Sequence, residues 1–179
     1  MSAPPRSVRV PLRSLSDLFR NVVQIAYVTD DLDVGVEWLQ STLGTSPVHT
    51  MYSSSLGGTV IVDDQPAEEW VIDAALVNAG PTNIELIRPI SGAVDMYRRG
   101  IRPGAPATFH HIGVRIDDFD EATELITRNG RRWEQYGSTG AIRFGYLDMT
   151  AELGHRVEVM ELGPGMQRLL EMLREESDR

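Results

Sequence analysis

Residues 24–33 read QIAYVTDDLD, and residues 111–120 read HIGVRIDDFD. Each stretch starts as an apolar-rich strand, passes a group of carboxylates suited to starting a helix, and enters a helical stretch that ends at a glycine, Gly44 or Gly130. The second stretch keeps residues of the first in the same places: Ile25, Asp30, Asp31 and Asp33 recur as Ile112, Asp117, Asp118 and Asp120. The chain therefore contains an internal repeat, and each copy begins with a strand and a helix.

The rest of each copy extends this pattern. In the first copy, residues 32–43 carry apolar side chains at helical spacing, and residues 70–90 predict two strands joined by a turn. In the second copy, residues 133–149 and 155–162 predict three shorter strands. Both copies fit one order, a strand, a helix and three strands (βαβββ). The long irregular stretch 45–64 in the first copy is expected to form a lid or a subunit contact.

These patterns divide the chain into five segments. The Arg-containing N-terminal segment lacks the continuous apolar stretch of a secretory signal and is interpreted as an arm. The segments are an N-terminal arm (1–20), a first βαβββ module (21–90), a linker with a short helical stretch (91–106), a second βαβββ module (107–162) and a C-terminal helix (163–179). The length of 179 residues favours one compact domain that contains both modules.

Composition narrows the class of function. The net charge of -9 would repel a phosphate backbone, so nucleic acid is not expected as a partner. No apolar run approaches the roughly 20 residues that span a bilayer, so a membrane is not expected either. The sequence holds no cysteine, which agrees with a cytoplasmic location. Any metal ion must therefore be bound by nitrogen and oxygen donors.

Four polar residues interrupt apolar strands, two in each copy and at matching strands: Gln24, Glu85, His111 and Glu158. A carboxylate inside an apolar strand is costly unless it is paired or bound to a cation, so two such glutamates indicate a compensating positive charge. An imidazole, an amide oxygen and two carboxylates form a mostly hard donor set that suits one divalent ion such as Zn, Ni, Co, Mn or Mg. We expect these four residues to bind that ion.

Simpler interpretations exist for several polar residues. A lone Gln in a strand usually only satisfies its own hydrogen bonds, but Gln24 occupies the position that His111 occupies in the second copy. His110 should face the opposite side of its strand from His111, in a hydrogen-bonded structural role. The remaining carboxylates before the helices are interpreted as helix caps rather than metal ligands: Asp30, Asp31, Asp117 and Asp118.

Other residues are candidates for binding a substrate. Arg115 shares the strand face of His111 and could reach an anionic group, although an outer-strand Arg paired with an acid is an equal alternative. Phe144, Tyr146 and Met160 lie in the strands near the candidate ligands and could line a pocket, although such residues also commonly form a core.

The repeat and its polar residues resemble the vicinal oxygen chelate superfamily, which includes glyoxalase I, methylmalonyl-CoA epimerase, extradiol dioxygenases and bleomycin-resistance proteins. The resemblance covers roughly residues 21–162. It is carried by a ligand directly before Ile at the start of each module, Gln24 or His111, and by a Glu near a late strand of each module, Glu85 or Glu158.

The resemblance implies an α+β fold in which two βαβββ modules form a curled, cup-shaped mixed sheet of the glyoxalase type. It also implies a metal ion at the bottom of the cup, a small-molecule substrate and a homodimer. The implied activity is that of a metal-dependent lyase or isomerase, which removes a proton next to a carbonyl through a metal-bound enolate. Glu158, or else Glu85, would act as the base.

Two alternatives belong to the same superfamily. A metal-free, bleomycin-resistance-like protein would hold a ligand in the cup without chemistry. A different metal-dependent reaction, by a dioxygenase, hydrolase or dehydratase, is possible on the same fold. Extradiol dioxygenases need two His and one carboxylate around iron, and Gln24 stands where one of those His would be.

Overall fold

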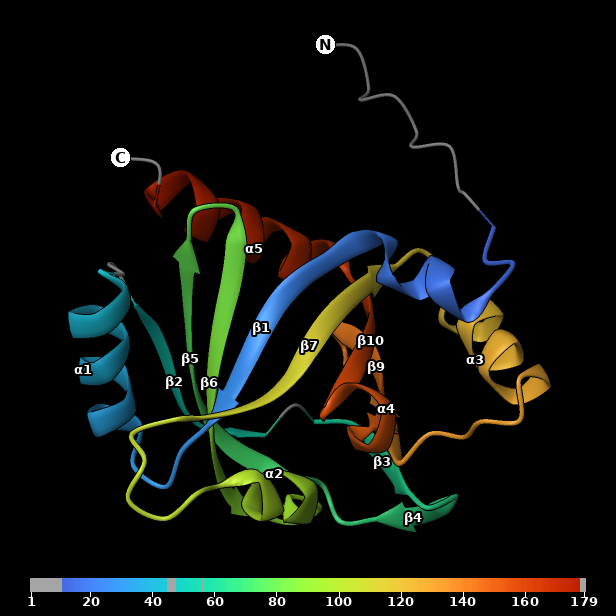
Figure 1. The fold of residues 1–179 in the computed structure, drawn as a ribbon, viewed down its shortest axis with the longest axis horizontal. Coiled ribbons are helices and arrows are strands. Elements are labelled where there is room, and N and C mark those ends of the chain that lie inside the picture. The colour runs from blue at the N-terminus through green and yellow to red at the C-terminus, as the bar shows by residue number, and fades with distance from the viewer. Residues whose placement is uncertain (1–10, 45–47, 56, 178–179) are drawn as a thin grey trace, which may run out of the picture.

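The computed structural model describes residues 11–44, 48–55 and 57–177. Within them, ten strands form one sheet in the order β2-β5-β6-β1-β7-β10-β9-β8-β3-β4, which curls into a cup (Figure 1). The first repeat supplies β1 (Val22–Val28), α1 (Leu32–Leu43), β2 (His49–Ser55), β5 (Val71–Ala79) and β6 (Thr82–Ser91). The second supplies β7 (Thr108–Ile116), α3 (Phe119–Arg128), β8 (Gln135–Ser138), β9 (Ile142–Met149) and β10 (His155–Leu162). The expected fold class is confirmed.

The two repeats join through β1 and β7, which pair antiparallel. Ile25 lies opposite Ile112, so the repeated isoleucines mark the joint between the halves. On either side of the joint the halves are alike, because β1 pairs parallel with β6 and β7 pairs parallel with β10. These four strands are therefore neighbours at the centre of the sheet.

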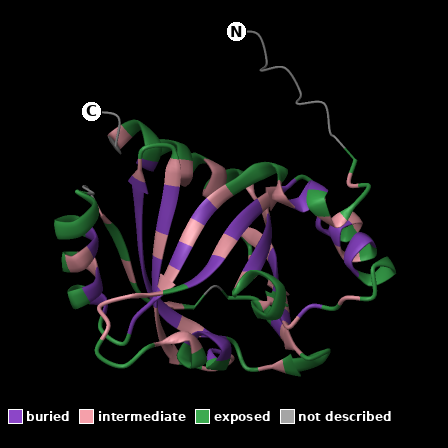
Figure 2. Cartoon of the chain, in the orientation of Figure 1, coloured by how far each residue is buried: buried purple, intermediate pink, exposed green. Residues whose placement is uncertain are grey.

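Helices α1 and α3 cover the outer side of the sheet, each with one buried and one exposed side (Figure 2). Asp31 caps α1 by accepting hydrogen bonds from the backbone of Asp33 and Val34, and Asp118 caps α3 by accepting one from Glu121. The capping role predicted for these two aspartates is confirmed. Because each helix starts directly after the first strand of its repeat, the cap fixes where the strand ends.

The stretch after α1 contains structure that its sequence pattern did not predict. A hairpin of β3 (Thr59–Val62) and β4 (Gln65–Ala67) extends the opposite edge of the sheet, where β3 pairs with β8. A Cβ at Gly137 would lie 2.3 Å from the carbonyl oxygen of Thr59, so this pairing depends on glycine. A segment of the first repeat thus completes the wall built by the second. Residues 45–47 and 56 of the predicted lid lie outside the described residues.

Four further elements surround the sheet. A 3-10 helix, η1 (Leu15–Asn21), precedes β1, and its Leu18 is buried in the core under α3. Residues 1–10 of the predicted arm lie outside the described residues. The linker between the halves contains α2 (Asp95–Gly100), and α4 (Thr150–Leu153) joins β9 to β10.

The predicted C-terminal helix is α5 (Pro164–Ser177), which packs on β5 and β10 with Leu173 buried. In Figure 1 it crosses one end of the cup. Among the helices of the described residues, none is both long enough and apolar enough to cross a bilayer.

Candidate metal and substrate site

The four predicted ligands lie on the four central strands, Glu85 on β6, Gln24 on β1, His111 on β7 and Glu158 on β10. The strand register brings them together in pairs. Ala26 lies between Glu85 and His111, because it is the Cα partner of both. In the matching place on the neighbouring strand, Gly113 lies between Gln24 and Glu158. In each of these two places, a small residue, Ala26 or Gly113, therefore has one predicted ligand on each side of it.

The register at Gly113 needs glycine. A Cβ on Gly113 would lie 2.9 Å from Oε1 of Gln24 and 2.6 Å from Cε of Met160. Any larger residue would displace the amide or the thioether beside it. Ala26, which takes the corresponding place in the first repeat, is fully buried.

Three ligand atoms form a close group. Nε2 of His111 lies 3.2 Å from Oε2 of Glu158 and 4.0 Å from Oε2 of Glu85. One ligand atom from each of the three residues lies within 4.8 Å of the other two. His111 and Glu158 are buried, whereas the side chain of Glu85 keeps 16% of its surface exposed toward the cavity.

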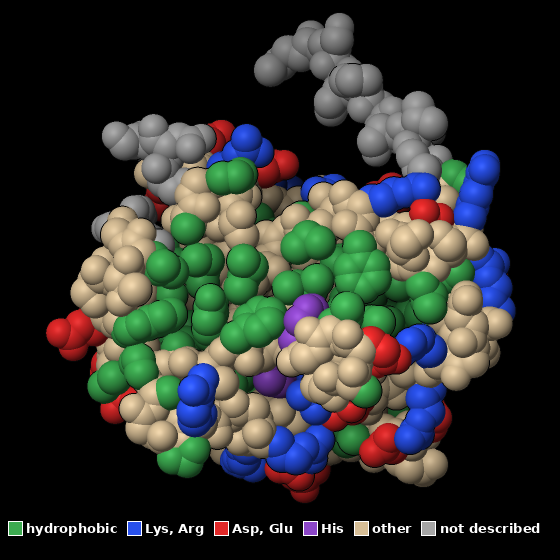
Figure 3. Space-filling model, in the orientation of Figure 1, with side chains coloured by type: hydrophobic (Ala, Val, Ile, Leu, Met, Phe, Trp, Pro, Cys, Tyr) green, Lys and Arg blue, Asp and Glu red, His purple; other side chains and the backbone are tan. Residues whose placement is uncertain are grey.

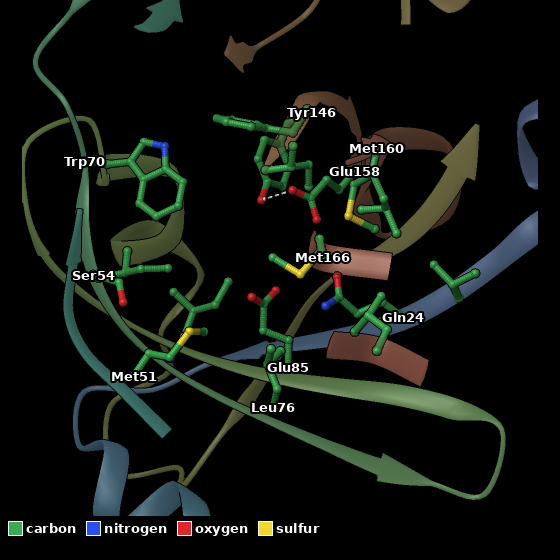
Figure 4. A pocket seen from close by; sticks show the side chains of 18 of the residues that line it. Gln24, Met51, Ser54, Trp70, Leu76, Glu85, Tyr146, Glu158, Met160 and Met166 are labelled. Carbon is green, nitrogen blue, oxygen red and sulfur yellow. Dashed lines mark hydrogen bonds between the residues drawn. The ribbon is translucent and has the colours of Figure 1, made fainter. Parts of the chain in front are cut away.

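The fourth predicted ligand presents an unsatisfied acceptor. Gln24 is buried and its Nε2 donates to Oδ1 of Asn83 at 3.0 Å, while its Oε1 has no hydrogen-bond partner. A buried carbonyl oxygen without a partner is rare because desolvation without a hydrogen bond is costly. Figure 4 shows this amide directed toward the same cavity as the carboxylates of Glu85 and Glu158.

Burial controls the charge of these groups. It raises the pKa of Glu85 to about 8, with a further contribution from the charge of Glu158, and raises the pKa of Glu158 to about 7 despite the hydrogen bond that Tyr146 donates. Burial, helped by the charge of Arg156, lowers the pKa of His111 to about 3, so its imidazole is neutral. Two carboxylates and a neutral imidazole that face one another accommodate a divalent cation, which would offset the cost of ionising both acids.

A chain of hydroxyl groups supports Glu158. Tyr146 donates to Oε1 of Glu158 at 2.8 Å, and Tyr97 of α2 donates to the hydroxyl of Tyr146 at 2.9 Å. Burial raises the pKa of both phenols well above the ordinary value, so both remain protonated donors. Oxygen Oε1 of Glu158 is thus held from one side, and Oε2 faces His111.

A cavity of about 100 Å³ opens above these groups. Apart from the polar groups already named, its wall is mostly apolar, and Figure 4 shows Met51, Trp70, Leu76 and Met160 around the acids. Helix α5 closes one side with Met166 and Leu170. The wall therefore favours apolar groups on a ligand.

Among the predicted substrate-binding residues, Phe144, Tyr146 and Met160 line the cavity. Arg115 lines an adjoining hollow with Asn83, Gln167 and Leu170. It lies two residues beyond Gly113 along β7, where Leu170 of α5 stands between the hollow and the cavity. Arg115 thus lines this hollow and not the cavity above the acids, and its contact with an anionic group of a substrate stays a prediction.

Sequence reasoning did not single out several residues of the site. Tyr97 belongs to the linker, and Trp70, Met166 and Leu170 occur in segments with no polar residue that marks a site. His110 was expected to face away from His111, but a β-bulge between β1 and β7 at this point brings the Nδ1 atoms of the two rings to 2.9 Å. A bulge breaks the alternation on which that expectation rested.

Comparison with known proteins agrees with this architecture. The family model of the Glyoxalase/Bleomycin resistance protein/Dioxygenase superfamily matches residues 23–146. No curated protein matches the chain.

Solved structures of methylmalonyl-CoA epimerases are similar. The enzyme from Mycobacterium tuberculosis has a TM-score of 0.53 at 20% identity, over 83% of this chain and 91% of that chain. A methylmalonyl-CoA epimerase in complex with methylmalonyl-CoA and NH4+ has a TM-score of 0.53 at 20% identity, over 80% and 95%. A variant from Streptomyces coelicolor in complex with 2-nitronate-propionyl-CoA has a TM-score of 0.54 at 18% identity, over 80% and 95%. At such identities the likeness shows a common fold.

Proposed function

The chain belongs to the Glyoxalase/Bleomycin resistance protein/Dioxygenase superfamily, and on that premise we propose that it is a metal-dependent lyase or isomerase that removes a proton next to a carbonyl group. The observation that carries this proposal is the convergence of Glu85, His111 and Glu158 within 4.8 Å of one another at the base of an apolar cavity. The unpartnered Oε1 of Gln24 supports a fourth ligand.

Gln24, Glu85, His111 and Glu158 would hold one divalent ion. Such an ion, when bound, supplies positive charge that stabilises the oxyanion of an enolate. Hard oxygen donors and one imidazole agree with Zn, Ni, Co, Mn or Mg. With these four residues as ligands, the ion would still be open to oxygen atoms of a substrate.

Glu158 is the proposed base. In the metal-free protein, burial raises the pKa of Glu158 to about 7, so this carboxylate accepts a proton more readily than an exposed glutamate does. Tyr146 donates to Oε1, which orients the carboxyl group and leaves Oε2 on the side of His111. Glu85 is the second candidate, because its pKa is raised as well and its carboxylate faces the same cavity. Return of the proton to another carbon gives isomerisation, and return to the opposite face gives epimerisation.

The cavity wall limits the reacting part of the substrate. Aromatic and thioether side chains from Trp70, Phe144 and Met160 favour an uncharged, apolar group beside the carbonyl. An anionic portion would extend past α5 into the adjoining hollow, where Arg115 and Gln167 lie. Compounds with a carbonyl and a long polar tail, such as acyl-CoA thioesters, and glutathione hemithioacetals are the substrates to test first.

The decisive measurement is solvent deuterium exchange. Protein loaded in turn with Zn, Co, Ni, Mn or Mg is incubated in deuterated buffer with a panel of acyl-CoA thioesters and hemithioacetals. We expect incorporation of deuterium next to the carbonyl of at least one compound, and loss of incorporation after chelation. Absence of exchange across the panel with metal demonstrably bound would reject proton abstraction.

The second candidate function is that of a ligand-binding protein without metal. The apolar character of the cavity wall favours it. Thermal unfolding in the presence of each ion separates the two. A rise in melting temperature with a divalent ion supports the enzyme. No shift with any ion, together with binding of apolar compounds in the cavity, supports the binding protein.

A further inference from the structure

The two neutral ligands, Gln24 and His111, can each present to the site either an atom that binds a cation or an N–H group that does not. A carboxamide binds a cation through oxygen and not through its NH2 group, and a neutral imidazole binds through the nitrogen that carries no proton. Exchange of the two amide atoms, or of the imidazole tautomer, would turn an N–H toward the position of the ion. The site of the proposed function therefore requires that both orientations are fixed from outside.

Asn83 fixes the amide of Gln24. Nδ2 of Asn83 lies 3.0 Å from the side-chain amide of Asn78 and 3.3 Å from the carbonyl oxygen of Val77. Because the backbone carbonyl only accepts, the group of Asn83 that faces it is the NH2 group. This leaves Oδ1 of Asn83 as an acceptor for Nε2 of Gln24, at 3.0 Å. Oε1 of Gln24 is then the amide atom left free for a cation, because it has no hydrogen-bond partner.

His110 fixes the imidazole of His111 by the same logic. Nε2 of His110 lies 3.2 Å from the carbonyl oxygen of Met96, so this nitrogen carries the proton. In the neutral ring Nδ1 is then an acceptor, and Nδ1 of His111 donates to it at 2.9 Å. Nε2 of His111 is left without a proton, 3.2 Å from Oε2 of Glu158 and 4.0 Å from Oε2 of Glu85.

The surroundings hold His110 in this pose. The bulge in β7 turns its ring toward His111, and the ring of Tyr97 packs against it with 5.2 Å between centroids. A Cβ at Gly100 would lie 2.8 Å from Cδ2 of His110, so α2 approaches the ring closely. His110 is buried, with 3% of its surface exposed, so water has little access as a substitute donor or acceptor.

We propose that Asn83 and His110 are positioning residues, each anchored on a backbone carbonyl, which turn Oε1 of Gln24 and the unprotonated Nε2 of His111 toward the cation. This inference rests on the metal site of the proposed function, but the hydrogen-bond pattern exists in the metal-free protein and is testable there. Neither residue is among the four proposed ligands of the ion.

The first test is the tautomer of His111. In metal-free protein labelled with 15N, the two-bond 1H–15N correlation spectrum distinguishes a proton on Nδ1 from one on Nε2. We expect the proton of His111 on Nδ1. A proton on Nε2 in the unsubstituted protein would overturn the assignment for His110 without recourse to any variant.

The second test is metal affinity in variants. His110→Phe removes both hydrogen bonds at similar volume, and His110→Asn returns an acceptor near the position of Nδ1. We expect Co²⁺ or Zn²⁺ to bind His110→Phe about 10–100-fold more weakly, with partial recovery in His110→Asn, and Asn83→Leu to weaken binding similarly. His49→Phe, on exposed β2, is the matched control and should bind as the unsubstituted protein does.

The outcomes separate this inference from the proposed function. Unchanged affinity and tautomer in His110→Phe overturn the positioning role. If the unsubstituted protein binds no divalent ion, but His111 carries its proton on Nδ1 and loses that preference in His110→Phe, the proposed function fails while the control of the His111 tautomer by His110 stands. If His110→Phe does not fold, the unsubstituted spectrum and His110→Asn still decide.

Discussion

The two halves of the sheet share a plan but hold their ligands differently. The first half contributes Gln24, whose support is one amide, and Glu85, which remains partly exposed to the cavity. The second half contributes His111, fully buried, and Glu158, which accepts from a tyrosine that a second tyrosine supports. The two halves thus have ligands at matching positions, but the hydrogen bonds around those ligands differ.

This difference indicates that the two glutamates have different roles. A residue that must exchange a proton benefits from a fixed orientation and a pKa near neutrality, and Glu158 has both. A residue with open access to the cavity is better placed to yield to a substrate, and Glu85 has that access. The halves are expected to respond unequally when matching residues are changed.

The largest effect is expected from Glu158→Gln. Loss of the base should lower the rate of deuterium exchange by about 10²–10⁴-fold at saturating metal, whereas Glu85→Gln should act mainly on metal affinity. Exchange rates and metal dissociation constants of both variants provide the measurement. Glu124→Gln, on the exposed side of α3, is the control. If Glu85→Gln abolishes exchange and Glu158→Gln preserves it, the roles of the two halves are reversed.

Next in size is the effect of a methyl group at the small residue between the ligands. Gly113→Ala would place Cβ 2.9 Å from Oε1 of Gln24 and 2.6 Å from Cε of Met160, and such overpacking costs about 1–3 kcal/mol. We expect a lower free energy of unfolding in urea and weaker metal binding. Gly140→Ala, where a Cβ meets nothing within 4 Å, is the control. Equal stability of the two variants would show that Gln24 and Met160 move aside freely.

The buried acids predict an unusual pH dependence of the metal-free protein. Between pH 6.5 and 8, glutamates of the unfolded chain are ionised, whereas folded Glu158 (pKa about 7) and Glu85 (pKa about 8) still bind protons. The folded state binds more protons, so stability falls as the pH rises through this window. The pKa values of His111 and His110 are both lowered to about 3, so near pH 6.5 the unfolded chain still binds part of their protons, and this smaller opposing contribution fades as the pH rises further.

Melting temperatures measured across that window check the prediction. The doubly substituted variant Glu85→Gln, Glu158→Gln should lose the decline, and excess divalent ion should reverse its direction, because ionised carboxylates bind the ion more tightly. A flat profile for the unsubstituted metal-free protein would contradict the raised pKa values of these acids.

Much of the fold could be predicted because the repeat fixes local patterns. A ligand before Ile25 and one before Ile112 mark two equivalent strands, and polar residues in the late strands mark the other pair. The hairpin β3–β4 could not be predicted, because it pairs with β8, far along the chain, and nothing in residues 59–67 specifies that partner. The pairing of strands that lie far apart in the sequence depends on the assembled sheet and not on the sequence of either strand alone.

The residues that orient the ligands, such as His110 and Tyr97, could not be predicted for a related reason. Strict alternation along β7 separates His110 from His111, and only the register with β1 reveals the bulge that joins them. Tyr97 is a linker residue whose role depends on where α2 docks. Sequence periodicity thus identified the ligands, while the groups that orient them depended on register and packing.

The smallest effect on chemistry is expected at the outer side of the joint between the halves. Figure 3 shows hydrophobic side chains gathered over β6, β1 and β7. There Phe109 is 40% exposed, and its ring contacts Tyr27 and His155. We expect a homodimer to form on this surface, because a second copy would bury the apolar side chains of both halves at once.

Sedimentation velocity on Phe109→Glu tests this surface. Like charges brought together across a twofold axis should yield monomers, while the rate of deuterium exchange per chain stays unchanged, because Phe109 is not among the residues that line the cavity. Val34→Glu, at an exposed position on α1, is the control and should remain dimeric. If the unsubstituted protein is monomeric at all concentrations, the predicted dimer is wrong. Slower deuterium exchange in Phe109→Glu would show that a change at the joint between the halves affects the site.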